Sequence, residues 1–251
     1  MAQFLFITDL DNTLVGDDEA LSSLNQQLQE HRDRHRTRIV YATGRSLTLY
    51  RELQSEKPLL KPDALITGVG TAIYYDDEGT TTDTEWSVIL QQGWNREIVT
   101  SITAHYADLT PQPSYEQGPF KVSFYLSESA AVNVLPRLKQ QLTERGINAN
   151  LIYSGGHDLD ILPIAANKGA AIQFLRKQWQ MNGDRTVTCG DSGNDLAMLA
   201  LEDVHGIIVG NAKTELLEWH NSNPSSKRYL AKATCAGGIL EGLRHFGFFT
   251  V

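Results

Sequence analysis

Phe4-Leu5-Phe6-Ile7-Thr8-Asp9-Leu10-Asp11-Asn12-Thr13 is the stretch that decides the fold. Four apolar residues run directly into two carboxylates, and an acidic, glycine-containing loop follows at residues 15–18. This pattern predicts a buried strand that ends in a loop. Because alternate side chains of an extended segment point the same way, Asp9 and Asp11 are expected to reach one point beyond the strand.

Two carboxylates at one point repel each other and need a physical reason to be there. A divalent cation, a shared proton, or a nucleophile beside an acid would each provide one. An acidic turn that caps a helix is the alternative interpretation, since Asp and Asn are common in turns. Open α/β sheets place their active sites at the ends of strands, which favours a functional role for Asp9 and Asp11 over a capping turn.

Composition limits the class of protein. The chain has 251 residues, of which 41% are hydrophobic and 21% are charged, as is usual for a globular protein of one large or two smaller domains. The net charge of −8, without a basic run, predicts no nucleic-acid partner. No apolar stretch approaches a membrane span, no cleavable signal is evident, and two cysteines make no disulfide framework; we therefore expect a cytoplasmic protein with no membrane partner.

Strand-like and helix-like segments alternate near both ends of the chain. The alternation predicts βαβ units and an α/β fold with a Rossmann-like parallel sheet. Strands are expected at residues 4–8, 38–42, 64–67, 186–189 and 206–209, and helices at 21–32, 46–54, 167–180, 194–201 and 214–220.

The middle of the chain differs from both ends. We expect a hinge at residues 80–84, a helix at 94–106, a turn-rich segment at 110–119, strands at 121–126, 149–153 and 158–162, and a helix ending near 146 that Pro136 starts or kinks. We interpret residues 84–158 as a small α+β cap domain, inserted into a core formed by residues 1–83 and 159–251.

Polar motifs end the predicted core strands or open a helix at four places. They are Asp9–Thr13, Thr43-Gly44-Arg45, Asn167-Lys168-Gly169 and Gly190-Asp191-Ser192-Gly193-Asn194-Asp195. Since the carboxyl ends of parallel strands share one edge of a sheet, these loops are expected to converge. Taken singly, each is an ordinary turn, a solvated lysine or a helix cap.

Together the motifs offer the parts of a phosphoryl-transfer site. Asp9 suits a nucleophile, and Asp11 suits a general acid and base. Thr43 can hydrogen-bond phosphoryl oxygens, and Lys168 can supply positive charge. Asp191 with Asp9 can bind Mg²⁺, while Asn194 and Asp195 would position Lys168 or metal-bound water.

The ordered set resembles the haloacid dehalogenase superfamily of phosphohydrolases, with a cap of the C2 type. The resemblance implies Asp9 as nucleophile, Asp11 as acid and base, and Thr43 and Lys168 as phosphate ligands. We expect Gly44 and Asn194 to bind the phosphate as well. The resemblance also implies Mg²⁺ bound by Asp9, Asp191 and the backbone carbonyl of Asp11. We expect Thr13, Ser192 and Asp195 to support these residues.

Longer segments resemble the sucrose-phosphatase family of cyanobacteria and plants. They include FITDLDNTLVGD, YATGRS, LITGVGTAIYY, FKVSFYL, SGGHDLDILP, CGDSGND and ATCAGGILEGLRHFGFF. The resemblance covers nearly the whole chain. It implies hydrolysis of sucrose 6F-phosphate to sucrose and phosphate through an aspartyl-phosphate, the last step of sucrose synthesis.

A disaccharide pocket requires paired polar groups and one or two aromatic rings. Residues of this character in and near the cap are Gln112, Ser114, Lys121, Tyr125, His157 and Asp158. Gln112 and Ser114 also fit ordinary exposed positions. Asn167 can cap its helix and bind at the phosphate end, whereas Arg45 either contacts substrate or braces its loop.

Two other functions remain open at this stage. The first is a phosphatase of the same fold that acts on another sugar phosphate or on a glycosyl phosphoglycerate. The second is a non-catalytic, phosphatase-like module that binds a sucrose-phosphate synthase, an association that is also open to an active enzyme.

Overall fold

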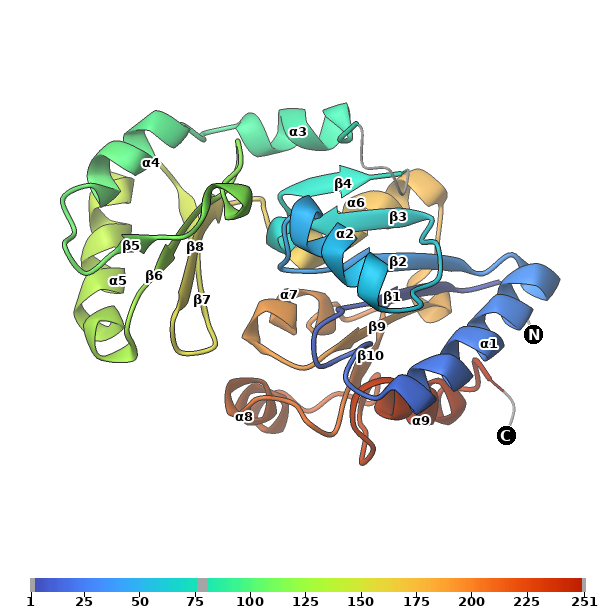
Figure 1. Cartoon of the computed structure of the whole chain (residues 1–251). Helices are drawn as coiled ribbons and strands as arrows, with labels where there is room; N and C mark the ends of the chain where they lie inside the picture. The colour runs from blue at the N-terminus through green and yellow to red at the C-terminus, as the bar shows by residue number, and fades with distance from the viewer. Residues whose placement is uncertain (1–2, 76–80, 250–251) are drawn as a thin grey trace.

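The computed structural model describes residues 3–75 and 81–249, which form two β-sheets with helices around them (Figure 1). The elements are β1 (Leu5–Thr8), α1 (Asp18–His35), β2 (Arg38–Ala42), α2 (Leu47–Glu56), β3 (Ala64–Thr67), β4 (Ala72–Tyr74), α3 (Thr84–Gln91), α4 (Arg96–Thr103), β5 (Thr110–Pro111), β6 (Val122–Tyr125), α5 (Glu128–Glu144), β7 (Ala149–Ser154), β8 (Asp158–Pro163), α6 (Lys168–Trp179), β9 (Thr186–Gly190), α7 (Leu196–Leu199), β10 (His205–Ile208), α8 (Thr214–Ser222), β11 (Arg228–Leu230) and α9 (Cys235–His245).

The seven-stranded sheet has the order β11-β10-β9-β1-β2-β3-β4. All neighbouring strands are parallel except β3 and β4. The chain builds outward from β1 on one side through β2, and later returns to the other side through β9. The carboxyl end of β1 therefore lies at a topological switch point, where such sheets bind ligands. The parallel-sheet core expected from the sequence is confirmed.

The sheet is apolar on both faces because helices cover both. Phe4 and Phe6 pack with α1, α2 and α9, whereas Leu5 and Ile7 pack with α3, α6, α7 and α8. Burial on both faces explains why β1 is a continuous apolar run rather than an alternating one.

The four-stranded sheet has the order β5-β6-β8-β7 and is antiparallel. Helices α4 and α5 cover its outer face (Figure 1). Val122 and Phe124 of β6 and Leu159 and Ile161 of β8 are buried with these helices. The alternate residues of both strands therefore point to the opposite face.

Two contacts move the expected ends of the cap. Trp86 and Leu90 place α3 in the core, since they are buried with β1 and β3. Strand β8 pairs with β6 and β7, so residues 158–163 belong to the second sheet. From the sequence, residues from 159 onward were expected to belong to the core. We propose that the cap comprises residues 94–163, and we use the word in this sense below.

Local expectations also differ from the structure in the cap. Helix α5 begins at Glu128, capped by Ser127, and Pro136 lies inside it. Packing of its apolar face on the cap sheet outweighs the one backbone hydrogen bond that Pro136 cannot make. Residue 80 of the expected hinge lies outside the described residues, while 84 begins α3, with Asp83 as its N-cap.

Five elements were not predicted from the sequence: the short strands β4, β5 and β11, the two-turn helix α3 and the glycine-rich helix α9. Helix α9 approaches β10 so closely that a Cβ at Gly242 would lie 2.6 Å from Ile207. Glycine, which disfavours helix by about 1 kcal/mol, is therefore needed here for packing.

Both cysteines, Cys189 and Cys235, are buried and free. Within the described ranges, none of the helices combines the length and the apolar character needed to cross a membrane.

Candidate active site

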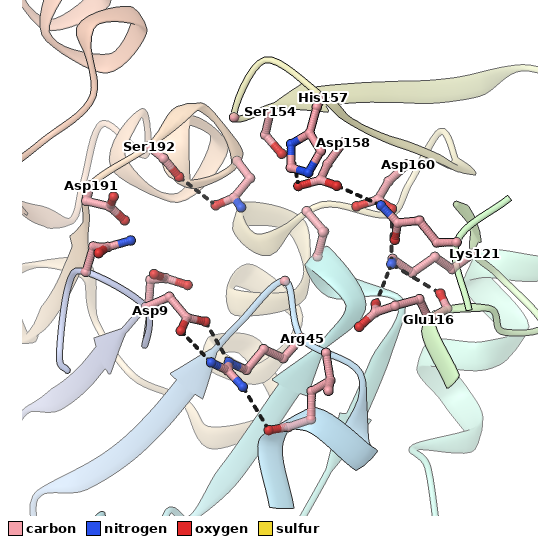
Figure 2. A pocket seen from close by; sticks show the side chains of 18 of the residues that line it. Asp9, Arg45, Glu116, Lys121, Ser154, His157, Asp158, Asp160, Asp191 and Ser192 are labelled. Atoms are coloured by element: carbon pink, nitrogen blue, oxygen red, sulfur yellow. Dashed lines mark hydrogen bonds and ion pairs between the residues drawn. The ribbon is translucent and has the colours of Figure 1, made fainter. Parts of the chain in front are cut away.

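A cavity of about 460 Å³ lies between the carboxyl end of the seven-stranded sheet and the cap (Figure 2). Twelve of the residues singled out in the sequence line it: Asp9, Asp11, Gly44, Arg45, Gln112, Lys121, Tyr125, His157, Asp158, Asp191, Ser192 and Asn194. The structure therefore brings the polar groups of the core and of the cap to one space.

Lys168 forms a fully buried charge cluster beneath the core side of the cavity. It opens helix α6, and its ammonium donates to Asp9 Oδ1 and to Asp195 Oδ1, each at 2.6 Å. The Lys168 side chain has no exposed surface. Burial of this charge is tolerable only because two carboxylates compensate it.

The electrostatics of this cluster follow from burial and from the neighbouring charges. Burial raises the pKa of Asp9 to about 8, against the lowering effect of Lys168, and Asp195 adds to the rise. Burial likewise raises the pKa of Asp191 to about 6, with a further contribution from Asp195. The pKa of Lys168 is raised, because its two carboxylate partners outweigh its burial. Three carboxylates thus lie near one ammonium, which contacts two of them.

Asp9, Asp191 and Asp195 each offer an oxygen within 4.8 Å of the others. Thr13 donates to Asp191 Oδ1 at 3.0 Å and so orients that carboxylate. Asp195 is already engaged, since its second oxygen accepts from the backbone N–H groups of Asp191 and Ser192. The surplus negative charge and the oxygen donors of Asp9 and Asp191 fit a hard dication such as Mg²⁺.

The loop after β2 is fixed by the neighbouring loop after β3. Thr43 is buried, its N–H donates to the carbonyl of Ile66, and its own carbonyl accepts from the N–H of Val69. Val69 is buried at the cavity wall and has φ +59°. This left-handed conformation is rare for a β-branched residue. Strain of this kind gathers at functional sites.

Arg45 forms a two-pronged ion pair with Asp11. Its Nε donates to Oδ2 and its Nη2 to Oδ1, both at 2.7 Å. These hydrogen bonds raise the pKa of Arg45 above its ordinary value. Of the two alternatives that the sequence left open for Arg45, neither included a direct bond to the second carboxylate of the first motif.

A second lysine cluster lies on the cap side of the cavity, as Figure 2 shows. Lys121 is buried, and its ammonium lies 3.0 Å from Glu116 Oε2 and 3.0 Å from Asp160 Oδ1. Ser123 donates to the same Asp160 oxygen at 2.6 Å. Glu116 and Asp160 were missed in the sequence, although Asp158-Leu159-Asp160 repeats the spacing of Asp9-Leu10-Asp11 and places both carboxylates on one face of β8.

Other predicted cap residues form a polar and aromatic rim. Gln112 donates to Asp158 Oδ1 at 2.8 Å, so it does more than occupy an exposed position. The rings of Tyr125 and His157 are stacked, with centroids 5.7 Å apart and planes inclined by 11°. Burial raises the pKa of Asp158.

Six candidate residues from the sequence, among them Ser114, are not among those that line the cavity. Thr13, Thr43, Lys168 and Asp195 lie behind it and contact or support lining residues, whereas Asn167 caps α6 by accepting from the N–H of Ala170 at 2.8 Å. Only the capping role of Asn167 is visible. Lys213 and Val69 line the cavity without having been anticipated, since each sits in a loop whose partners are distant in sequence.

A parallel sheet with acidic loops at its carboxyl end and a smaller domain across them is the fold of capped phosphatases of the haloacid dehalogenase superfamily. The chain belongs to the sucrose-6F-phosphate phosphohydrolase family, whose model matches residues 2–247.

Two relatives of this chain differ in their length and in the substrate that their names give. The chain is 42% identical to sucrose-phosphatase 2 of Nicotiana tabacum over 97% of its own length, but spans only 59% of the tobacco protein. It is 35% identical to mannosylfructose-phosphate phosphatase of Agrobacterium fabrum, covering 97% of this chain and 96% of that one.

Among solved structures, the sucrose-phosphatase of Synechocystis sp. PCC6803, in complex with sucrose and phosphate, superposes with a TM-score of 0.90. The two chains are 40% identical, and the match covers 98% of each.

Proposed function

We propose that this protein is a Mg²⁺-dependent phosphatase that hydrolyses sucrose 6F-phosphate to sucrose and phosphate. The observation that carries the proposal is one cavity with two chemically different sides. The core side holds Asp9 against a buried ammonium, and the cap side holds a rim of hydrogen-bonding groups. The likeness to sucrose-phosphatases over nearly the whole chain supports the choice of sugar.

The reaction divides into two steps. In the first, a carboxylate oxygen of Asp9 forms a bond to phosphorus, the bond from phosphorus to the sugar oxygen breaks, and that oxygen takes a proton from Asp11. In the second, Asp11 accepts a proton from water as the water oxygen attacks phosphorus. The bond to Asp9 then breaks, and phosphate leaves.

Charge on the transferred group must be balanced in a cavity that is itself acidic. Lys168 stands beside the attacking oxygen of Asp9 at 2.6 Å and is held there by Asp195. Mg²⁺ held by Asp9, Asp191 and the backbone carbonyl of Asp11 would supply further positive charge and favour the ionised form of Asp9. Gly44 and Asn194 line the cavity, which supports their proposed role as partners of the phosphoryl oxygens.

The cap is proposed to bind the sugar. Ser123, Tyr125, Asp158 and Asp160 share one face of the cap sheet, because Ser123 pairs with Asp160 and Tyr125 with Asp158. Hydrogen-bonding groups held on one face of a sheet give the sugar hydroxyls defined partners, which favours one sugar over others.

A second candidate is a phosphatase of another disaccharide phosphate, and the full-length likeness to mannosylfructose-phosphate phosphatase favours it specifically. Both substrates are phosphates of a fructose-containing disaccharide, so the cap side decides between them. The cytoplasmic location and the association with a sucrose-phosphate synthase stay predictions.

The first experiment is a phosphate-release assay with and without a chelator. The substrates are sucrose 6F-phosphate, mannosylfructose phosphate, fructose 6-phosphate, glucose 6-phosphate and a glycosyl phosphoglycerate. We expect Mg²⁺-dependent release chiefly from sucrose 6F-phosphate and none from the Asp9→Asn variant. Preference for another ester would reject the sugar assignment, and no release from any would favour the non-catalytic module.

A further inference from the structure

We propose that Arg45 is the positioning residue of Asp11, and that its guanidinium sets the direction from which this carboxyl group exchanges protons with the leaving oxygen and with water. The inference rests on the proposed function, because it gives Asp11 the acid and base role. It goes further in making the acid–base step depend on a residue of the phosphate-binding loop.

The contact has the geometry of a fixed pair. Two parallel N–H groups of Arg45 meet the two oxygens of Asp11, each at 2.7 Å. A pair of this kind fixes both the place and the plane of a carboxylate, which a single lysine contact does not.

Arg45 can impose this position because it is itself held at three places. Its Nη1 donates to the carbonyl of Leu49 at 3.0 Å, and its backbone N–H donates to Thr43 Oγ1 at 3.1 Å. Its carbonyl accepts from the N–H of Gly68 at 2.9 Å. Arg45 is thus anchored through its guanidinium to the first turn of α2 and through its backbone to the loops after β2 and β3.

Burial does not fix Asp11, since 43% of its side chain is exposed, against 7% for Asp9. Asp9 and Asp191 line the same cavity and repel a third carboxylate. Without the guanidinium, Asp11 would turn toward solvent and away from the other carboxylates.

The ion pair leaves Asp11 able to react. A carboxylate has about four lone-pair sites, and a two-pronged arginine uses two of them. The remaining sites accept a proton from water, and the protonated group retains one arginine contact as it donates to the leaving oxygen. Arg45 therefore orients the exchange and takes no part in bond making.

The leaving group of the substrate distinguishes a residue that positions the acid Asp11 from one that contacts the phosphate. A sugar alkoxide needs a proton as it leaves, whereas p-nitrophenolate does not. The test is the single-turnover rate of leaving-group release from the preferred sugar phosphate and from p-nitrophenyl phosphate, which isolates the first step from hydrolysis of the phosphoenzyme.

In Arg45→Ala, we expect about a 10²-fold loss on the sugar phosphate, at the lower end of general acid effects, and a much smaller loss on the aryl ester. Asp11→Asn should show the same selectivity, and the double variant should lose no more than Asp11→Asn alone. Arg45→Lys should recover only part of the rate. Arg51→Ala, an exposed arginine on α2, is the matched control and should behave as wild type.

Equal losses on the two substrates would overturn the proposal, because they indicate a phosphate contact. A rise in KM alone would overturn it as well, as would full rescue by Arg45→Lys. If the wild type releases phosphate from no ester, the proposed function fails instead, and the two failures are thereby distinguished.

Discussion

Two buried lysines lie on opposite sides of the same cavity, Lys121 at its wall and Lys168 behind it, and each binds two carboxylates. Lys168 in the core lies at 2.6 Å from both of its partners and is fully buried. Lys121 in the cap lies at 3.0 Å from both of its partners, with 6% of its side chain exposed. The same residue types therefore form a tighter and more deeply buried cluster around Asp9 than in the cap.

The difference matches what each side is proposed to do. A catalytic charge must stay in one place while charge develops at phosphorus, and a dry site strengthens its effect. A recognition group must exchange its partners for sugar hydroxyls, which is easier at longer distances and with some access to water. The comparison predicts that replacing each lysine affects stability and activity in a different way.

Replacement of Lys168 by Met should have the largest effect. Asp9 and Asp195 would remain buried without their ammonium, and breaking a buried pair in this way costs about 3–5 kcal/mol. Urea unfolding should show the loss, and phosphate release should disappear for every ester. Lys177→Met, an exposed position on the same helix, is the control and should change stability by less than about 0.5 kcal/mol. A stable Lys168→Met variant would refute the charge assignment of the core cluster.

Replacement of Lys121 by Met should be less severe. Its partners keep 12% and 11% of their side chains exposed, so we expect a loss of about 1–3 kcal/mol, as for buried groups left without a partner. KM for the disaccharide phosphate should rise, whereas hydrolysis of p-nitrophenyl phosphate should change little. If both substrates lost activity equally, the division between a catalytic and a recognition lysine would be wrong.

The pH dependence of the metal-free protein should report the surplus of carboxylates in the core. Burial raises the pKa of Asp191 from 3.8 to about 6, so the folded state binds this proton more tightly than the unfolded chain. The stabilisation is complete below 3.8 and is lost as pH rises through about 6. Thermal unfolding should therefore show a falling Tm over this window. At pH values above this window, Mg²⁺ should raise the Tm. Asp191→Asn should weaken both the fall of Tm with pH and its rise with Mg²⁺.

The smallest effect concerns the stacked rings of the rim. Tyr125 is 40% exposed, so Tyr125→Ala should leave stability nearly unchanged. Loss of a ring contact worth about 0.5–1.5 kcal/mol should raise KM for the disaccharide phosphate roughly 2- to 10-fold. Tyr125→Phe keeps the ring and serves as the control. An unchanged KM in both variants would remove the rings from the proposed sugar site.

The core side was more predictable from the sequence than the cap side. Asp9, Thr43 and Asp191 each follow or end a strand of a parallel sheet, and the topology of such a sheet brings strand ends together. The cap cluster joins a loop, one strand and a neighbouring antiparallel strand, so its assembly depends on a register that the sequence does not reveal. Glu116 and Asp160 were missed for that reason.

The predicted boundaries of the cap, residues 84 and 158, differ from the structure for a related physical reason. Residues 84–91 were not predicted as a helix, so the burial of Trp86 and Leu90 against the core sheet was not anticipated. Strand β8 was recognised as a strand, yet its sheet is decided by pairing with β6 and β7. Arg45 shows the same limit at the site itself, since its partner lies 34 positions away.

The two buried thiols have a practical consequence for observing this molecule. Cys189 and Cys235 lie under the surface, and buried thiols of raised pKa react slowly with alkylating reagents. A cysteine introduced at Val132, which is 73% exposed on α5, would then be modified selectively in the native chain. The cap can therefore carry a fluorescent reporter without removal of either native cysteine.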